Sequence, residues 1–462
     1  MGRYSQRLGL WCVNFFIAWP TLVLAGDGDT HQTTLDNGLL VVVREDHRAP
    51  VAVTQVWYKV GSSYEPQGIT GLSHMLEHMM FKGTEQHPKD NFSMSVSADG
   101  GILNAFTADD VTVYHEQVAA SKVPQMLALE ADRMVNIVLN PDDLRSELQV
   151  VKEERRMRIE DSPEGHLFER FNAAAFISSP YHHPTIGWMH DIDQYNTKDL
   201  REWYQKWYAP NNAIVVVVGD VDPKSIMAEV EKQFGHLSRR EIPVLKNVGE
   251  VEPLGERRVQ VKVPAKLPQL FVGYNVPVVT TAKEAWEPYA LLVLANILSG
   301  SDSARLPREL VREQQVLNQA DVYYDILARL DQLLILSGVP AQGHTITEAE
   351  VTLLAQIQRL QTELVSDAEL TRVKTNVKAA RIYDKDSMGV QAEEIGTYTA
   401  LGLPWQLADE FVPSMEAVTA QQIQQVAQKY LIADRRTVAI LDPQPMTTDT
   451  PITSPGDMQH VR

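Results

Sequence analysis

A five-residue segment, His74-Met75-Leu76-Glu77-His78, brings two imidazoles and a carboxylate together within one helical turn. At about 100° per residue, His78 lies only ~40° around the helix from His74, and Glu77 lies only ~60° from it. Both imidazoles can therefore bind one Zn²⁺, while the carboxylate takes a proton from a water molecule that the metal activates. The remaining helix face is apolar and should pack against a core; it consists of Leu72, Met75, Met79 and Met80.

The order of the residues in this segment is informative. In H-E-x-x-H zinc proteases the glutamate follows the first histidine, whereas here Glu77 precedes the second, an order typical of inverzincins. The alternative is two ordinary histidines beside a glutamate on a surface helix. Chance predicts this pattern in about one of fifty such chains, so we favour the metal site.

A catalytic zinc site requires a third protein ligand and an open position. The candidates lie on a helix that should begin with Asn140 as N-cap and Pro141 at the first helical position. Glu147 and Glu154 are seven residues apart and lie on one face within ~20°, and Glu153 is a third candidate. Spacing does not choose among them, and a charged, solvent-exposed helix face would show the same pattern.

Length and charge limit the function classes. A chain of 462 residues is too long for one core and predicts two or more domains. The net charge of −18 argues against a nucleic-acid partner, since phosphate binding requires a basic face.

The first residues predict an export signal. Two arginines precede a mostly apolar segment, 8–24, and Val23 and Ala25 suit cleavage after residue 25, so we expect residues 1–25 to be a signal peptide. An uncleaved membrane anchor is the alternative. The only cysteine, Cys12, lies in this segment, and no later stretch is apolar enough to span a bilayer. We therefore expect a cysteine-free mature chain with no stable membrane span, in the periplasm of a Gram-negative bacterium.

The chain contains an internal repeat. Residues 197–208 match residues 419–430, and both segments lead at the same offset into an apolar strand, 213–220 and 437–442. Two copies of one α/β unit explain this pattern better than coincidence.

The second copy lacks the candidate metal ligands. Aligning 72–83 with 289–300 superimposes two apolar helical segments, and His74 then falls on Leu291. Glu77 and His78 fall on Leu294 and Ala295. We therefore expect the second half to serve as a scaffold and as a wall of the substrate chamber.

The sequence predicts an α+β fold with two homologous domains, each a mostly antiparallel sheet covered by helices. A segment rich in charge, proline and glycine near Arg239–Glu256 marks the boundary. We expect a catalytic domain over 26–242, an inactive domain over 243–445 and a flexible tail over 446–462. Representative elements are strands at 51–58 and 270–274 and helices at 353–364 and 367–381.

The combined motifs resemble the pitrilysin family, particularly its short members similar to the β subunit of mitochondrial processing peptidase. The resemblance runs from about Thr33 to Pro443 and rests on His74-x-x-Glu77-His78, the later glutamates, 100–107, Gly187 with 191–193, 208–212 and 219–222. It implies that Glu154 is the third ligand of one Zn²⁺ per chain and that Glu147 supports the catalytic site. It also implies that the two domains form half of a clam-like peptide chamber.

Residues 100–107 predict a hairpin. Two glycines precede a strand containing Asn104, Ala105 and Phe106, and a second strand follows at 111–115. The edge of such a hairpin can bind an extended peptide by strand addition. The residues alone favour an ordinary buried hairpin, whereas the resemblance implies that this strand binds the substrate backbone.

One departure from the family pattern concerns the second half. Family members that complete the site within one chain tend to carry an arginine followed seven residues later by a tyrosine; here Arg312 is present but Gln319 replaces the tyrosine. We expect Arg312 to contribute to substrate binding and a homologous subunit to supply an Arg/Tyr pair in a heterodimer, with a homodimer as the alternative.

The sequence thus predicts a zinc-dependent endopeptidase that hydrolyses peptides or unfolded polypeptides, with Glu77 as general base and then acid. The main alternative is a non-catalytic scaffold subunit of the same fold, since the family includes members that have lost catalysis. A zinc-binding or transport protein is weaker, because a storage site does not need a free base beside the metal.

Overall fold

The computed structural model describes residues 30–89, 91–246 and 248–446. The expected signal peptide, 1–25, and all but the first residue of the expected tail, 446–462, lie outside the described residues. Within the described part, no helix has both the length and the apolarity needed to cross a membrane.

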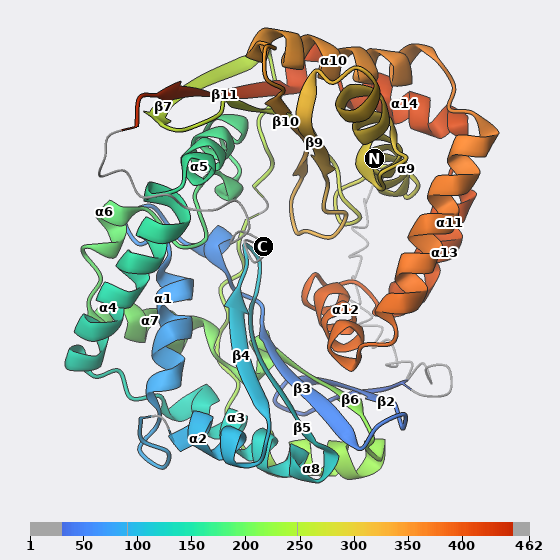
Figure 1. The fold of residues 1–462 in the computed structure, drawn as a ribbon. Helices are drawn as coiled ribbons and strands as arrows, with labels where there is room; N and C mark the ends of the chain where they lie inside the picture. The colour runs from blue at the N-terminus through green and yellow to red at the C-terminus, as the bar shows by residue number, and fades with distance from the viewer. Residues whose placement is uncertain (1–29, 90, 247, 447–462) are drawn as a thin grey trace, which may run out of the picture.

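Two β-sheets form the framework, one in each half of the chain (Figure 1). The first has the order β1-β2-β6-β3-β5-β4 and the second β7-β11-β8-β10-β9. The strands are β1 (Thr30–Thr34), β2 (Leu40–Glu45), β3 (Val51–Tyr58), β4 (Ile102–Thr107), β5 (Thr112–Ala119), β6 (Ala213–Gly219), β7 (Arg257–Pro264), β8 (Gln269–Val276), β9 (Leu317–Tyr323), β10 (Gln332–Pro340) and β11 (Arg436–Gln444).

The two sheets repeat one topology. β6 pairs in parallel with β2 and antiparallel with β3, and β11 pairs in the same way with β7 and β8. β5 and β4 then complete the first sheet, as β10 and β9 complete the second, so among the described strands only β1 has no counterpart. The predicted α+β class, with two domains and mostly antiparallel sheets, is confirmed.

The repeated helix–strand units begin at strong N-caps. In both α7 (Thr197–Trp207) and α14 (Ala420–Tyr430) a capping box satisfies the first free N–H groups, with Asn196 as the N-cap of α7 and Thr419 as that of α14. The predicted helix at 353–364 begins earlier, because Thr345 forms a capping box at its N-terminus. The main helices are α1 (Leu72–Met79), α3 (Val123–Asn136), α4 (Pro141–Arg155), α5 (Pro163–Ala175), α7 (Thr197–Trp207), α8 (Pro223–Phe234), α9 (Glu287–Ser299), α10 (Ile346–Thr362), α11 (Asp367–Asp384), α12 (Met388–Ala400), α13 (Leu407–Ala417) and α14 (Ala420–Tyr430).

Each sheet buries one face under helices of its own half. The first core includes side chains of α1, α3, α7 and α8 together with the first sheet, and the second core includes side chains of α9, α10 and α14 together with the second sheet. In α1 the predicted apolar face is buried, with Leu72, Met75 and Met79 fully inaccessible. Burial of this face anchors the helix that carries the histidines.

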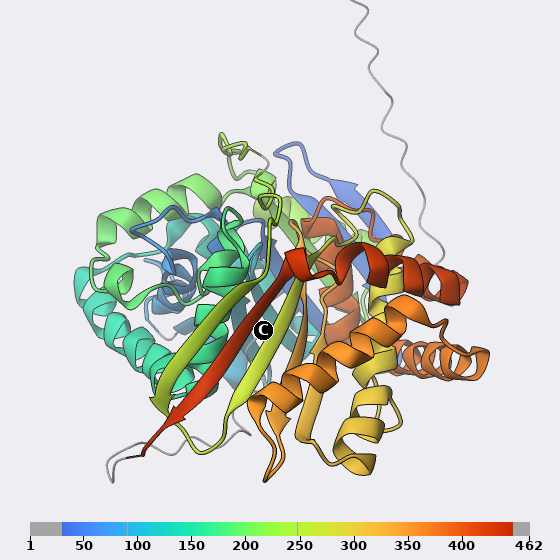
Figure 2. The ribbon, with the colours of Figure 1, turned by 90° about the horizontal axis from the view of Figure 1, so that it is seen from above.

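The other face of each sheet is covered by a helix from the opposite half. α5 of the first half packs on β7, β8 and β11, and α12 of the second half packs on β3 and β6 (Figures 1 and 2). Each contact places a large ring on a glycine: a Cβ on Gly273 would collide with the Phe171 ring, and one on Gly396 with the Trp57 ring. This exchange of covering helices, α5 on the second sheet and α12 on the first, joins the two halves through two apolar clusters.

Candidate metal centre

The start of α1 is fixed by a close approach of two backbones. Gly71 and Gly187 have φ angles of 86° and 85°, which favour glycine. A Cβ on Gly71 would collide with the carbonyl of Ile186, and one on Gly187 with that of Thr70. The loop around residue 187 therefore sets the position of the helix that carries the candidate metal ligands.

Two buried carboxylates hold the N-terminal end of α1. Glu65 accepts hydrogen bonds from the N–H groups of Gly71, at 2.5 Å, and Ser73, at 2.6 Å. Asp191 accepts from the backbone N–H and the hydroxyl of Thr70, at 3.0 and 2.7 Å. Burial raises the pKa of Glu65 to about 8, and its backbone hydrogen bonds oppose this rise. These contacts satisfy N–H groups that a helix N-terminus leaves free.

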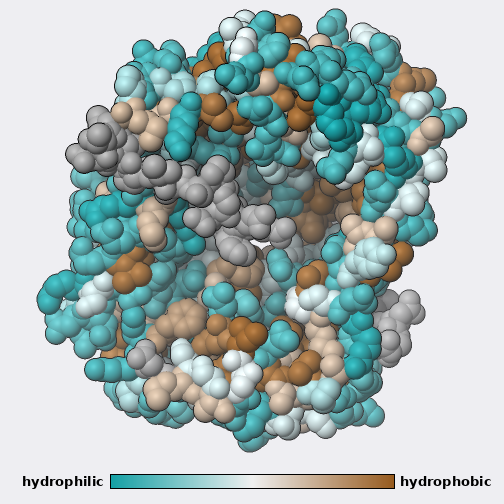
Figure 3. Space-filling view, in the orientation of Figure 1, coloured by the Kyte–Doolittle hydropathy of each residue, from teal (hydrophilic) through white to brown (hydrophobic). Residues whose placement is uncertain are grey.

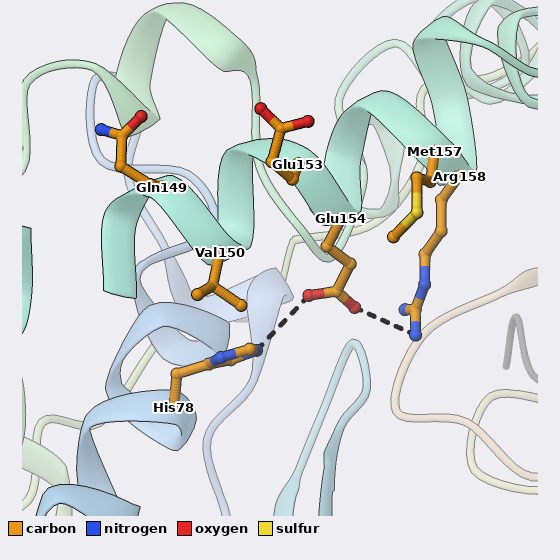
Figure 4. Close-up of a pocket in the computed structure, with 7 residues that line it drawn as sticks. All are labelled: His78, Gln149, Val150, Glu153, Glu154, Met157 and Arg158. Carbon is orange, nitrogen blue, oxygen red and sulfur yellow. Dashed lines mark ion pairs between the residues drawn. The ribbon is translucent and has the colours of Figure 1, made fainter. Parts of the chain in front are cut away.

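Helix α4 brings a glutamate to the two histidines. Asn140 caps α4 by accepting a hydrogen bond from Asp142, as the sequence predicts for this N-cap. Glu154 Oε2 then lies 3.4 Å from His78 Nε2 and 3.7 Å from His74 Nε2 (Figure 4 shows Glu154 and His78). Among the described residues, these three form the only group of at least three potential ligands whose donor atoms lie within 4.8 Å of one another.

The donor set and its spacing suit zinc. Tetrahedral Zn²⁺ with bonds of about 2.0–2.1 Å separates its ligand atoms by roughly 3.3 Å, close to the observed distances. Two imidazole nitrogens and one carboxylate oxygen match three-ligand catalytic sites, which keep a fourth position open. His74, His78 and Glu154 could therefore hold a zinc ion.

A second glutamate supports this group from outside. Glu147 Oε1 lies 3.1 Å from His78 Nδ1, which leaves Nε2 of that ring facing Glu154. Lys82 forms an ion pair of 2.5 Å with Glu147 Oε2. Glu153 instead has a side chain that is 60% exposed and pairs with Arg156. The structure therefore separates three glutamates that sequence spacing left equivalent.

The pKa shifts indicate where a positive charge is favoured. Burial, together with the nearby His78, lowers the pKa of His74 to about 3. Burial also disfavours charge on His78, but hydrogen bonds to Glu147 and Glu154 outweigh it and raise its pKa to about 9. The pKa of Glu154 is lowered to about 2, because its contact with His78 and the charges of His74 and Arg158 outweigh burial. A cation between these groups would satisfy the same carboxylates that favour a proton on His78.

The remaining acid of the segment, Glu77, is buried beside the metal group. Its side chain accepts a hydrogen bond of 2.6 Å from the Thr107 hydroxyl. Burial raises the pKa of Glu77, and the contact with Thr107 opposes this shift. A raised pKa suits a group that accepts and returns a proton near neutral pH.

Comparison with known proteins identifies the family. Residues 40–187 match Insulinase (Peptidase family M16), and residues 194–377 match Peptidase M16 inactive domain. The zinc protease PqqE of Helicobacter pylori is 34% identical over 77% of this chain and 80% of its own length. The chain belongs to peptidase family M16. The predicted resemblance to the pitrilysin family is therefore confirmed.

Solved structures of two proteases share the fold. The crystal structure of a protease from Helicobacter pylori aligns with a TM-score of 0.85 at 29% identity, over 90% of this chain and 99% of that one. The periplasmic protease PqqL from Escherichia coli aligns with a TM-score of 0.73 at 18% identity, over 92% of this chain and 49% of that one. At that identity the second match shows the fold alone.

The predicted edge strand is present in this M16 chain. β4 lies at the edge of the first sheet and pairs with β5, from Ile102 opposite Gln117 to Thr107 opposite Thr112. Asn104 is exposed, and Ala105 and Phe106 are partly buried. Apolar side chains gather over this region, bordering a hollow between the two halves (Figure 3). That β4 binds substrate stays a prediction.

Arg312 lies in the second half, outside the group of metal ligands. It is an exposed residue of a π-helical segment, Leu306–Glu313. Gln319, which stands in place of the expected tyrosine, is exposed on β9 and donates a hydrogen bond to Asp321. The role of Arg312 in substrate binding stays a prediction.

An open recess of about 680 Å³ adjoins the metal group (Figure 4). Its lining combines the apolar side chains of Val150 and Met157 with the guanidinium of Arg158, which lies 3.0 Å from Glu154 Oε1. Because Arg158 occupies Oε1, Oε2 is the oxygen that faces the histidines. The recess leaves open space beside the candidate metal ligands.

Sequence reasoning missed several residues that support the site. Lys82 and Arg158 each lie four residues after a predicted site residue, a helical spacing that could have revealed them. Thr107 ended the predicted edge strand, but nothing in the sequence linked it to Glu77. Glu65 had no local signal, because its partners lie across a turn.

Proposed function

We propose that this M16 chain is a zinc-dependent endopeptidase that hydrolyses peptides or unfolded polypeptides bound in extended form. The convergence of His74 Nε2, His78 Nε2 and Glu154 Oε2, with the Glu77 carboxylate beside them, carries the proposal. A bound Zn²⁺ would acidify a water molecule and polarise the scissile carbonyl.

The residues of the chain have separate tasks in this reaction. Glu77 takes a proton from the attacking water and passes it to the leaving amine, as general base and then acid. Glu147 holds the His78 ring through Nδ1, so that Nε2 faces the metal position. Burial of Glu77 limits its contact with bulk water and raises its pKa toward the working range.

The edge strand β4 supports the proposal of an extended substrate. A peptide that pairs with β4 gains backbone hydrogen bonds that do not depend on its sequence, and alternate side chains face the chamber and the metal group. This binding mode suits unfolded chains, because a folded substrate rarely presents a free strand.

Glu77→Gln tests the catalytic role most directly. The variant should retain zinc and peptide affinity while kcat falls about 10²–10⁴-fold, because the amide cannot accept the proton. Zinc content and cleavage of a fluorescence-quenched peptide are the measurements. Glu153→Gln is the matched control, since that acid is exposed on the neighbouring helix. Retained turnover in Glu77→Gln would refute the proposal.

We propose that the active form is a heterodimer, in which a second, homologous subunit supplies an Arg/Tyr pair; a homodimer, which would repeat Gln319, is the alternative. The glutamine at position 319 supports this, because it cannot provide a phenol to a substrate carbonyl. Light scattering coupled to size exclusion, with a cleavage assay on each fraction, tests it. Full activity in a monomer fraction would contradict the requirement.

We propose a periplasmic location, reached through cleavage after residue 25. The charge and apolar pattern of residues 1–25 supports export. N-terminal sequencing of the protein from the periplasmic fraction should begin at Gly26, and an intact Met1 in the membrane fraction would contradict this proposal.

A scaffold role is the second candidate, and it is supported by the match of residues 194–377, which include much of the second half, to the M16 inactive domain. Purified protein with about one zinc per chain and chelator-sensitive cleavage supports the enzyme. Protein that neither binds zinc nor cleaves peptides supports the scaffold.

A further inference from the structure

Strand β4 has two different faces. Ile102 is 63% exposed, and Asn104 is exposed as well. Leu103 and Ala105 on the opposite face pack against the first core, next to α1. Thr107 continues this inner face and is only 7% exposed. The strand that could bind a substrate therefore also borders the helix that carries Glu77.

The Thr107 hydroxyl is the contact between this strand and the base. It donates a hydrogen bond of 2.6 Å to Glu77 Oε2. No other hydrogen bond to the Glu77 carboxylate occurs in the described part of the chain. One oxygen is thus held in place, and the other is left to exchange a proton. A hydrogen bond to a charged carboxylate is stronger than one between neutral groups, so it can select one orientation.

The backbone around Thr107 is firmly held. Thr107 pairs with Thr112 at the end of the hairpin, and the N–H of Ala108 donates to the carbonyl of Val111 at 2.9 Å. The following turn is fastened to the second half, because Asp110 accepts hydrogen bonds from Arg329 N, at 2.9 Å, and Arg329 Nε, at 3.1 Å. The position of the hydroxyl is therefore determined by the hairpin and its anchors.

We propose that Thr107 is a positioning residue that orients Glu77 for proton transfer and couples that orientation to the edge strand. This inference rests on the proposed peptidase function. In this proposal the free edge of β4 holds the substrate backbone, and Thr107 on the inner face of β4 holds Glu77. The distance between the substrate backbone and the Glu77 carboxylate is therefore set by one strand. Such fixed geometry matters because a displacement of about 1 Å can cost about a hundredfold in rate.

Thr107→Val removes the hydroxyl and keeps the shape of the side chain. We expect kcat on a fluorescence-quenched peptide to fall about ten- to a hundredfold, with KM and zinc content unchanged. Thr107→Ser, which keeps the hydroxyl, should restore most of kcat. Thr107→Ala replaces the valine variant if that variant does not fold.

Thr112→Val is the matched structural control. Thr112 is fully buried in the same hairpin, opposite Thr107, and its hydroxyl donates to the Val60 carbonyl at 2.9 Å. Its loss should lower the melting temperature but leave kcat near the wild-type value. An equal loss of kcat in Thr112→Val and Thr107→Val would show a merely structural role and overturn the inference.

Crystal structures provide a test that does not depend on activity. In Thr107→Val the Glu77 carboxylate should leave its original orientation, whereas in Thr107→Ser it should keep it. An unchanged Glu77, or an unchanged kcat in Thr107→Val, would overturn the inference. If the wild-type chain cleaves no peptide at all, the proposed function fails, and the orientation of Glu77 in the crystals still decides this inference.

Discussion

The two halves of this chain share a strand order and an exchange of covering helices, but only the first half has the candidate metal ligands. β6 and β11 occupy the same place in their sheets, and β4 and β9 both lie at an edge. α5 and α12 each cross to the opposite sheet. The fold that the two halves share therefore does not depend on the candidate metal ligands.

The aligned helices α1 and α9 differ at the positions of the candidate metal ligands. At the positions of His74 and Glu77 the second half has Leu291 and Leu294, both fully buried. Leucine gains free energy from burial, whereas a buried imidazole or carboxylate costs free energy unless it has a partner. His74 Nδ1, which has no hydrogen-bond partner among the described residues, illustrates this cost. The comparison indicates that apolar side chains of the second half stand where the first half has its candidate metal ligands.

The largest effect on zinc binding and turnover is expected when a candidate metal ligand of the first half is replaced by the leucine found at the aligned position of the second half. His74→Leu should reduce zinc from about one per chain to none and abolish turnover, because two ligands hold zinc poorly. The metal-free variant should melt no lower than metal-free wild type, since a leucine suits this buried position. Metal analysis and thermal melting after chelation measure both effects. His190→Leu, at an exposed histidine, is the control, and retained zinc in His74→Leu would show that His74 is not a ligand.

The exchanged helices provide the next test. Phe171→Ala in α5 and Trp57→Ala, under α12, should each lower the free energy of unfolding by about 3–5 kcal/mol, because each removes a fully buried ring. Urea titration measures the change. Phe168→Ala is the control on α5, since that ring is 40% exposed and should cost less. If Phe171→Ala costs no more than this control, the exchange does not stabilise the protein.

Glu147 tests whether a residue that contacts His78 from outside the candidate ligand group affects zinc binding. Glu147→Gln should weaken zinc binding about 10–100-fold, because the His78 ring loses its charged partner at Nδ1. Competition with a chromophoric chelator measures the affinity. Glu153→Gln should leave it unchanged, and equal affinities in both variants would remove Glu147 from the site.

The smallest effect concerns the turn where the two halves meet. Burial raises the pKa of Asp109 to about 6, and the charge of Asp110 adds to this rise. The unfolded chain therefore releases this proton near pH 4, whereas the folded chain keeps it until about pH 6, so stability is lost as the pH rises through this range. Asp109→Asn removes this loss and should raise the free energy of unfolding by about 1–2 kcal/mol at pH 7, with little change at pH 4.

Urea titrations of Asp109→Asn and wild type at both pH values measure this difference. The two hydroxyls that donate to Asp109, those of Ser62 and Thr185, can still bond to the amide oxygen of an asparagine at this position. A difference between variant and wild type that is the same at pH 4 and pH 7 would contradict the assignment.

Local patterns in the sequence predicted much of the fold and part of the site. The spacing of His74 and His78, the cap at Asn140 and the repeat around 197–208 and 419–430 all depend on neighbours in the chain. The choice of Glu154 over Glu153 did not follow from spacing, because both lie on a charged helix and only the approach of α1 separates them. The part played by Thr107 was hidden for the same reason, since its partner belongs to another element.

The sequence by itself determined the types of residue available for chemistry, the helix that places His74, Glu77 and His78 together, and the loss of these residues in the second half. Spacing left open which glutamate meets the histidines, and the family resemblance pointed to Glu154. Only the tertiary structure showed that the Glu154 carboxylate reaches both imidazoles, that the Thr107 hydroxyl bonds to Glu77, and that α5 and α12 each cover the sheet of the opposite half. Helical and strand periods act over a few residues and can be read locally, whereas contacts between distant segments depend on how whole elements pack.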